Sequence, residues 1–531
     1  MRLEGVTRTA AGLVRGVGEG DCWIFRGIPY AAPPVGGMRW RPPQPPLPWH
    51  SVFDASAFGP MAPQSPPMPG TEIPGDPTAW DEDCLTLNVW TPKLDGTPRP
   101  VLVWIHGGGF TGGTGASVLY AGDRLARQGA VVVTCNYRLG ALGFLAHPAL
   151  LGDSGDGSAA GNWGLLDQIA VLRWVQDNID GFGGDPGNVT LFGESAGGMS
   201  ASTLLATPLA IGLFHKVIVQ SGPPVTSSLA WGAFQAERLA EGLGLTGVTR
   251  KELEAVPAGA LVDATPGLGG GSIGDGTLPL PFVPVVDFRV LNQPPGEVLL
   301  TGKETPVPLL IGTTRDECTF FTLIDPQSAT ADEAHVMRRL SRLVGEERGA
   351  QIVGVYREAR ERRGESVTGA DLWTAITTDV VFRLPSLQLA TAHGQAGNRA
   401  YSYLFTQESP FLEGRLGSCH ALDIPFTFGT VTNPAISGYS GSGRAVFSLS
   451  EAMQRSWLAF ARTGDPSCDA VGDWPEYGSG QRPTMVIGPG GLLDSEGEIR
   501  QSQGLKWDPR GQERQIWEEM GVPAVAGHHQ E

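Results

Sequence analysis

The chain has 531 residues, of which 41% are hydrophobic and only 18% are charged, so it has enough apolar side chains to bury a large core. Its 55 acidic and 38 basic residues give a net charge of −17, which disfavours binding to nucleic acid or to anionic membrane surfaces. No apolar run is long enough to cross a bilayer.

Residues 1–16, MRLEGVTRTAAGLVRG, lack the apolar stretch of a secretory signal, and we therefore expect a cytoplasmic protein. Because no linker of sustained low hydrophobicity divides the chain, we expect one domain over residues 1–531, with a flexible tail at 520–531. The six cysteines lie singly, without CxxC pairs or histidines at metal-ligand spacing, which predicts reduced thiols and no metal site.

Five apolar runs rich in β-branched residues predict strands that are buried on both faces. They are VLVWI at 101–105, AVVVTCNY at 130–137, NVTLF at 188–192, KVIVQ at 216–220 and PLLIG at 308–312. Between the second and third runs, apolar residues recur every three or four positions from Leu166 to Ile179, as on one face of a helix. Strands that alternate with helices predict an α/β fold with a mostly parallel sheet.

The predicted strand at 188–192 leads directly into GESAG at 193–197 and then into the helix-compatible stretch GMSASTLLAT. A serine on a sharp turn between a strand and a helix projects its hydroxyl above the sheet, and glycines on either side avoid steric clashes in that turn. Ser195 is therefore a candidate nucleophile. An ordinary glycine-rich turn is the structural alternative.

A second glycine-rich segment, HGGGF at 106–110, follows the predicted strand at 101–105. Backbone N–H groups just beyond a strand end can bind the oxygen of a tetrahedral intermediate. The candidate donors are Gly108, Gly109 and Ala196. A phosphate-binding loop is disfavoured because neither GxGxxG nor a GK[ST] step is present.

A serine nucleophile needs a histidine base and a carboxylate that orients the histidine. In enzymes with a serine on such a turn, the acid follows the serine and the histidine follows the acid. Asp316 and Glu317 are adjacent candidates for the acid, just after the last predicted strand, and the residues alone do not rank them. His420 follows turn-forming residues, whereas His335 and His393 lie in stretches typical of helices.

These segments resemble the type B carboxylesterases, a family that includes cholinesterases and bacterial nitrobenzyl-type esterases, over nearly the whole chain. The resemblance is carried by FRGIPYAAPPVGGMRW at 25–40, EDCLTLNVWTP at 82–92, HGGGF at 106–110, GNWGLLDQ at 161–168 and FGGDPGNVTLFGESAGG at 182–198. It implies the α/β-hydrolase fold: a mostly parallel central sheet with helices on both faces and large loop and helical insertions.

The resemblance implies hydrolysis of small-molecule carboxylic esters through an acyl-enzyme, with Ser195 as nucleophile, His420 as base and Glu317 as the acid. It implies no metal and no organic cofactor, and it leaves the oligomeric state open. Amide, carbamate or thioester hydrolysis by the same triad is an alternative. A non-catalytic binding module of the same fold is disfavoured because all three triad residues are present.

Three further residues resemble supporting residues of that family. Glu194, beside the candidate nucleophile, is expected either to tune the charge of the site or to bond nearby backbone. Ser221, at the end of the predicted strand 216–220, and Asp423, three residues after His420, resemble a pair that steadies the histidine.

The cysteines depart from the family pattern. In many relatives the cysteine of EDCL pairs with one in a segment similar to FGPxCPQ, but this chain has Ala62 at that position. Cys84 therefore lacks its expected partner, with Cys22 as one conceivable substitute. Cys318 and Cys419 flank the proposed acid and base, and we expect buried, inert thiols rather than a redox sensor.

Three segments rich in glycine, proline or serine predict surface loops: residues 59–80, 265–279 and 433–444. Each lies near a candidate catalytic segment in the sequence. A role in substrate access is one interpretation, and a plain solvated loop is the simpler one.

Overall fold

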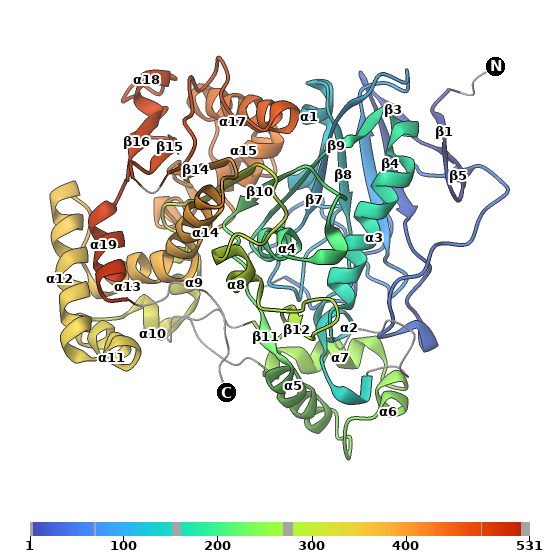
Figure 1. The fold of residues 1–531 in the computed structure, drawn as a ribbon, viewed down its shortest axis with the longest axis horizontal. Coiled ribbons are helices and arrows are strands. Elements are labelled where there is room, and N and C mark those ends of the chain that lie inside the picture. Colours follow the sequence, from blue (N-terminus) through green and yellow to red (C-terminus); the bar gives the residue numbers. More distant parts are fainter. Residues whose placement is uncertain (1–3, 68–70, 151–160, 269–279, 479, 522–531) are drawn as a thin grey trace.

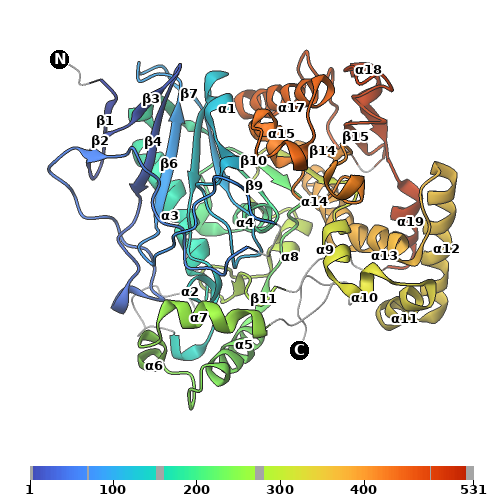
Figure 2. The same cartoon turned by 180° about the vertical axis from the view of Figure 1, so that it is seen from behind.

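The computed structural model of the chain describes residues 4–67, 71–150, 161–268, 280–478 and 480–521 (Figures 1 and 2). Most of the loop predicted at 265–279 and most of the tail predicted at 520–531 therefore lie outside the described residues. The described part is built around an 11-stranded sheet. Its strands are β3 (Val17–Glu19), β4 (Cys22–Pro29), β6 (Thr86–Thr91), β7 (Arg99–Ile105), β8 (Val131–Cys135), β9 (Gly184–Glu194), β10 (Lys216–Gln220), β13 (Leu309–Thr314), β14 (Ala400–Phe405), β15 (Pro483–Ile487) and β16 (Leu505–Trp507).

The strand order is β16-β15-β14-β13-β10-β9-β7-β8-β6-β4-β3. The five runs that predict strands form β7, β8, β9, β10 and β13, which lie side by side and parallel in the middle of the sheet. β14 and β15 continue the parallel part, whereas β16, β6, β4 and β3 pair antiparallel at the two edges. β9 begins four positions before the predicted strand because Gly184 also pairs with Arg99.

Two smaller sheets lie outside the central one. The first contains β1 (Val6–Thr9), β2 (Gly12–Arg15) and β5 (Phe53–Asp54), and the second pairs β11 (Ser227–Ser228) with β12 (Val285–Val286). The predicted loop at 59–80 is irregular in its described part apart from a single bridge between Met61 and Trp80.

Helices lie on both faces of the central sheet, and further helices extend from it (Figures 1 and 2). In chain order they are α1 (Asp123–Arg127), α2 (Gly140–Phe144), α3 (Trp163–Asn178), α4 (Ala196–Leu205), α5 (Leu229–Gly242), α6 (Arg250–Glu254), α7 (Ala258–Ala264), α8 (Pro295–Leu300), α9 (Thr319–Ile324), α10 (Pro326–Ala329), α11 (Glu333–Val344), α12 (Glu346–Arg363), α13 (Gly369–Thr378), α14 (Leu384–Gln395), α15 (Ile424–Phe428), α16 (Ser437–Ser440), α17 (Arg444–Thr463), α18 (Gln501–Gly504) and α19 (Gly511–Glu519). Within the described ranges, no helix combines the length and apolarity needed to cross a membrane.

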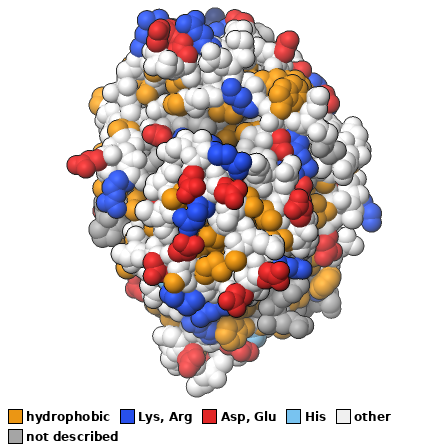
Figure 3. Space-filling model, turned by 90° about the vertical axis from the view of Figure 1, so that its left-hand side faces the viewer, with side chains coloured by type: hydrophobic (Ala, Val, Ile, Leu, Met, Phe, Trp, Pro, Cys, Tyr) orange, Lys and Arg blue, Asp and Glu red, His pale blue; other side chains and the backbone are white. Residues whose placement is uncertain are grey.

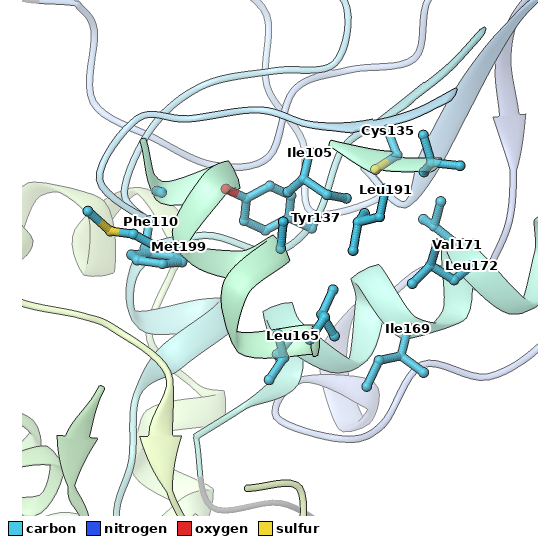
Figure 4. Close-up of a cluster of buried hydrophobic side chains, with 14 of the residues drawn as sticks. Ile105, Phe110, Cys135, Tyr137, Leu165, Ile169, Val171, Leu172, Leu191 and Met199 are labelled. Atoms are coloured by element: carbon cyan, nitrogen blue, oxygen red, sulfur yellow. The ribbon is translucent and has the colours of Figure 1, made fainter. Parts of the chain in front are cut away.

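Alternate side chains of each central strand enter different cores, because successive residues of a strand point to opposite faces. Val101 and Val103 of β7 belong to the core under α3 and α4, whereas Trp104 packs into the core under α17. Figure 4 shows Ile105 and its neighbours on the first face, where they meet side chains of α3 and α4. Burial of the sheet on both faces explains why the predicted strands are apolar throughout.

The segment 433–444 differs from the predicted loop. It contains the short helix α16, and α17 begins at Arg444. The segment is held in place because Ile436 is buried in the core beside α17. One buried apolar side chain among many glycines and serines is too weak a pattern to predict a helix.

Candidate active site

Ser195 lies between the last residue of β9 and the first residue of α4, at the carboxyl end of the central strands. Its backbone has φ 53° and ψ −125°, a conformation that non-glycine residues rarely adopt. The turn is fixed on both sides: the N–H of Ser195 donates to Gln220 O at 3.0 Å, and the N–H of Met199 donates to Ser195 O at 2.7 Å. The half-buried side chain thus projects from a sharp, rigid turn.

The glycines around Ser195 allow the close contacts that this turn needs. A Cβ atom on Gly193 would strike the backbone of Gly197, and one on Gly197 would collide with the carbonyl oxygen of Ile105. Both glycines therefore avoid steric clashes in this turn, as predicted from the sequence.

The glycine-rich loop after β7 lies directly against Ser195. A Cβ atom on Gly107 would lie 3.1 Å from Ser195 Cβ and 2.8 Å from Glu194 Oε2. Gly108 and Gly109 both have positive φ, at 111° and 60°. Within the described residues, the N–H groups of Gly108, Gly109 and Ala196 donate to no acceptor. They remain available to a substrate oxygen.

His106 fixes this loop, a function that the sequence did not indicate. Its ring is buried and stacks on Tyr137 at 4.4 Å, and burial lowers its pKa to about 4, so the imidazole is neutral. Nδ1 lies 2.8 Å from Gly107 O, which can only accept, so Nδ1 carries the proton. Since C=O of Gly107 and N–H of Gly108 belong to one planar peptide and point in opposite directions, this bond also fixes the direction of the Gly108 N–H.

We predict that His106→Ala lowers kcat for a simple ester by about 10²-fold, because a misdirected donor stabilises the transition state less well. KM should change little, since the oxygen charge develops mainly after binding. Steady-state kinetics check this, with His335→Ala on α11 as the control. An unchanged kcat in His106→Ala would show that the loop keeps its shape without the imidazole.

His420 and Glu317 form the second half of the site. His420 Nδ1 lies 2.6 Å from Glu317 Oε2, and the Glu317 side chain is fully buried. The other carboxylate oxygen, Oε1, accepts from Ser221 Oγ at 2.5 Å and from the N–H of Thr314 at 2.7 Å. These two donors hold the carboxylate so that its free oxygen faces the imidazole.

Asp316 faces away from His420 in the structure. Its Oδ2 accepts from the guanidinium of Arg315 at 2.7 and 2.9 Å and from the N–H of Ser418 at 2.9 Å. Burial opposes its ionisation, but Arg315 dominates and lowers the pKa of Asp316 below its ordinary value. Asp316 therefore anchors the turn, and of these two adjacent acids it is Glu317 that bonds the histidine.

His420 Nε2, the atom that would take the serine proton, lies 3.2 Å from Glu194 Oε1. Neither atom has a hydrogen-bond partner among the described residues, so Ser195 Oγ is not bonded to Nε2 in this structure. Burial alone lowers the pKa of an imidazole, but the carboxylates of Glu194 and Glu317 raise the pKa of His420 to about 9. Burial raises the pKa of Glu194 to about 8.

The supporting role expected of Ser221 and Asp423 stays a prediction. Ser221 is linked to His420 through Glu317, because its Oγ donates to the carboxylate that bonds His420 Nδ1. Asp423 is buried and accepts from Tyr403 Oη at 2.8 Å and from Gln220 Nε2 at 2.9 Å. Gln220, the last residue of β10, therefore links Asp423 to the strand end that precedes Ser221.

The chain matches the sequence pattern of the carboxylesterase family over residues 4–501. The chain belongs to this family. It is 38% identical to phenmedipham hydrolase of Pseudarthrobacter oxydans, covering 92% of this chain and 95% of that protein. It is 36% identical to para-nitrobenzyl esterase of Bacillus subtilis (strain 168), covering 96% and 98%.

Among solved structures, carboxylesterase EST55 of Geobacillus stearothermophilus superimposes with a TM-score of 0.83 at 36% identity, covering 97% of this chain and all of that one. The expected α/β-hydrolase fold is confirmed. This carboxylesterase is a serine-dependent hydrolase of small-molecule carboxylic esters, and its family does not favour the amide, carbamate or thioester alternatives.

Several features around the histidine of this carboxylesterase are invisible in its sequence. The rings of Phe382 and Phe321 lie 4.9 and 5.4 Å from the imidazole of His420. Tyr439 Oη donates to His420 O at 3.0 Å. These aromatic residues come from distant segments, and only the fold brings them together.

His335, His393 and the cysteines have no role in the proposed acid–base chemistry. His393 is buried in α14, between Glu304 Oε1 at 2.8 Å and Val307 O at 2.7 Å, and His335 lies on α11. All six cysteines are free, so Cys22 does not replace the missing partner of Cys84. Burial raises the pKa values of the Cys318 and Cys419 thiols to about 12, as expected of inert thiols.

Proposed function

We propose that Ser195 is the nucleophile, His420 the general base and Glu317 the acid of this esterase. The observation that carries the proposal is the direct bond between His420 Nδ1 and Glu317 Oε2, at the strand edge that also presents Ser195. A glutamate on Nδ1 keeps the proton there and leaves Nε2 free to accept a proton.

In the first half-reaction, Ser195 Oγ attacks the ester carbonyl carbon while His420 Nε2 takes the hydroxyl proton. The tetrahedral intermediate collapses when His420 returns this proton to the leaving alcohol, and an acyl-enzyme remains. Water then attacks the acyl carbon with His420 again as base, and the acid product and free Ser195 are released. Glu317 stabilises the imidazolium in both halves.

We propose that the N–H groups of Gly108, Gly109 and Ala196 bind the oxygen of each tetrahedral intermediate. Their lack of acceptors within the described residues supports this role. Ala196 is also the first residue of α4, where the helix dipole favours negative charge. Such donors stabilise the transition state by about 3 kcal/mol each.

The acyl-enzyme can be tested by partitioning. Esters that share an acyl group but carry different leaving alcohols are hydrolysed in the presence of methanol, and the ratio of methyl ester to free acid is measured. A common acyl-enzyme gives one ratio for every leaving alcohol. A ratio that follows the leaving alcohol would overturn the two-step route.

We predict that Glu194→Gln moves the rising limb of the pH profile of kcat/KM to lower pH. The base must be neutral, so activity rises as His420 loses its proton. Because the carboxylates of Glu194 and Glu317 raise the pKa of His420, this limb lies above the ordinary histidine pKa of 6.5. Removing the Glu194 charge makes the imidazolium less favourable. Glu333→Gln, on the surface of α11, is the control. A limb that stays in place or moves up would contradict this electrostatic role.

A further inference from the structure

A π-helix, Asp379–Arg383, joins α13 to α14 without a break in the helical path. Helices of this kind occur mostly as single turns, frequently at functional sites. One additional residue in a helix rotates the side chains that follow by about 100° relative to those before it. The segment lies in the covering helices and belongs to none of the motifs that carry the family resemblance.

One side of this segment contacts His420 and the residue next to Glu317. Phe382, in the π-helix, is buried, and its ring lies 4.9 Å from that of His420. It also stacks on Phe321 at 6.4 Å, with 12° between the ring planes. Thr378, four residues earlier, accepts the N–H of Cys318 at 3.0 Å, next to the acid Glu317. Phe382 therefore contacts the base, and Thr378 holds the residue that follows the acid in the chain.

The other side contacts the C-terminal segment. The carboxylate of Asp379 is buried and accepts from Tyr356 Oη at 2.6 Å, and Tyr356 Oη in turn accepts from Trp517 Nε1 at 3.0 Å. Arg383, four residues later, pairs with Asp379 at 3.3 Å and also donates to Pro509 O. All the side chains in this chain of contacts are buried, so water does not readily substitute for a lost partner.

α12 and α19, which carry Tyr356 and Trp517, are also joined at the surface. Arg363 of α12 pairs with Glu513 of α19 at 2.7 Å, and Arg362 donates to Gln512 at 2.6 Å. Figure 3 views the molecule from the side on which these helices lie in Figure 1, and acidic and basic side chains are interspersed there. The two helices therefore act as one support for the π-helix.

We propose that the π-helix positions His420, with Phe382 and Thr378 as positioning residues that the C-terminal segment holds in place through Tyr356 and Asp379. This inference rests on the proposed role of His420 as the base. Phe382 limits rotation of the imidazole, and Thr378 fixes the turn that carries Glu317. A displacement of about 1 Å in a catalytic group can lower the rate by about 10²-fold, so distant contacts of this kind are expected to affect catalysis.

The test uses Tyr356→Phe, which removes one hydroxyl that joins the C-terminal segment to the π-helix, and Phe382→Leu, which removes the ring on His420. Trp517→Phe removes the indole N–H that donates to Tyr356 Oη in the same chain of contacts, so a poorly folding Tyr356→Phe does not end the experiment. Tyr401→Phe is the matched control: its partly buried hydroxyl bonds Arg399 near the amino end of β14, away from the carboxyl ends of the strands. Thermal unfolding and circular dichroism establish that each variant is folded.

We expect a fall in kcat of about 10- to 100-fold for Phe382→Leu and a smaller fall for Tyr356→Phe and Trp517→Phe, with KM changed less than twofold. The low-field NMR signal of the proton between His420 and Glu317 should shift or broaden in the same variants and not in Tyr401→Phe. A merely structural role would lower stability and leave that signal unmoved. Folded variants with normal kcat and an unshifted signal would overturn the proposal.

The outcomes also separate this inference from the proposed function. If His420→Ala retains activity, His420 is not the base and the proposed function fails first. If His420→Ala is inactive while Phe382→Leu and Tyr356→Phe behave like the wild type, the catalytic assignment stands and only the positioning role fails.

Discussion

Ser195→Ala should lower kcat for a chromogenic short-chain ester by about 10⁶-fold, as in triad knockouts of serine hydrolases. In the proposed mechanism the hydroxyl oxygen of Ser195 forms the acyl bond, and the turn at φ 53° holds this side chain against the glycine-rich loop after β7. The substituted methyl group fits the same backbone, so folding should be preserved.

The matched control is Ser202→Ala on α4, the helix that follows Ser195. Ser202 is fully buried, and its Oγ donates to Gly222 O at 2.7 Å. Its loss should lower the free energy of unfolding by about 1 kcal/mol and leave kcat nearly unchanged. Substantial esterase activity in purified Ser195→Ala, above that of contaminating enzymes, would disprove the assignment of the nucleophile.

Glu317→Gln should lower kcat by about 10⁴-fold, even though glutamine has nearly the same size and shape as glutamate. The reason lies in the two donors on Oε1, Ser221 Oγ and the N–H of Thr314. They require the amide oxygen at that position, which places the NH₂ group against His420 Nδ1. The imidazole must then carry its proton on Nε2, the tautomer that cannot accept the serine proton.

Asp316→Asn is the matched control for Glu317→Gln, because the two acids are adjacent in the chain. Asp316 bonds Arg315 and the N–H of Ser418, and neither contact involves the imidazole. We expect kcat within a few-fold of the wild type and a lower unfolding temperature, measured by calorimetry. A large loss of kcat in Asp316→Asn with a harmless Glu317→Gln would reverse the two roles.

The central part of the fold and of the site could be predicted because local patterns determine both. Apolar runs predict strands buried on two faces, and all five lie together in the sheet. The glycines around Ser195 and the HGGGF segment each follow a strand end, so the parallel sheet must bring them to one edge.

The choice between Asp316 and Glu317 could not be made from the residues alone. The two side chains differ in direction rather than in type, and Arg315, Ser418 and Ser221 decide which acid faces the histidine. Arg315 precedes Asp316 in the chain, whereas Ser418 and Ser221 come from two distant segments that only the fold brings together. Resemblance to the family supplied what the local pattern lacked.

The support of His420 was equally inaccessible to sequence. α13, the π-helix and α14 form one continuous helical stretch, and a single extra residue in a turn leaves no mark on an apolar pattern. The partners of Ser221 and Asp423 were also beyond the sequence: Ser221 Oγ donates to Glu317, whereas Asp423 accepts from Tyr403 Oη.

Covalent labelling with a fluorophosphonate, followed by peptide mapping, tests the central claim most directly, because the reagent phosphonylates only a serine that a base has activated. We predict one phosphonyl group per chain, on the peptide that contains Ser195, with labelling abolished in Ser195→Ala and strongly slowed in Glu317→Gln. A phosphonyl group on any other residue, or unchanged labelling of Ser195→Ala, would contradict the account.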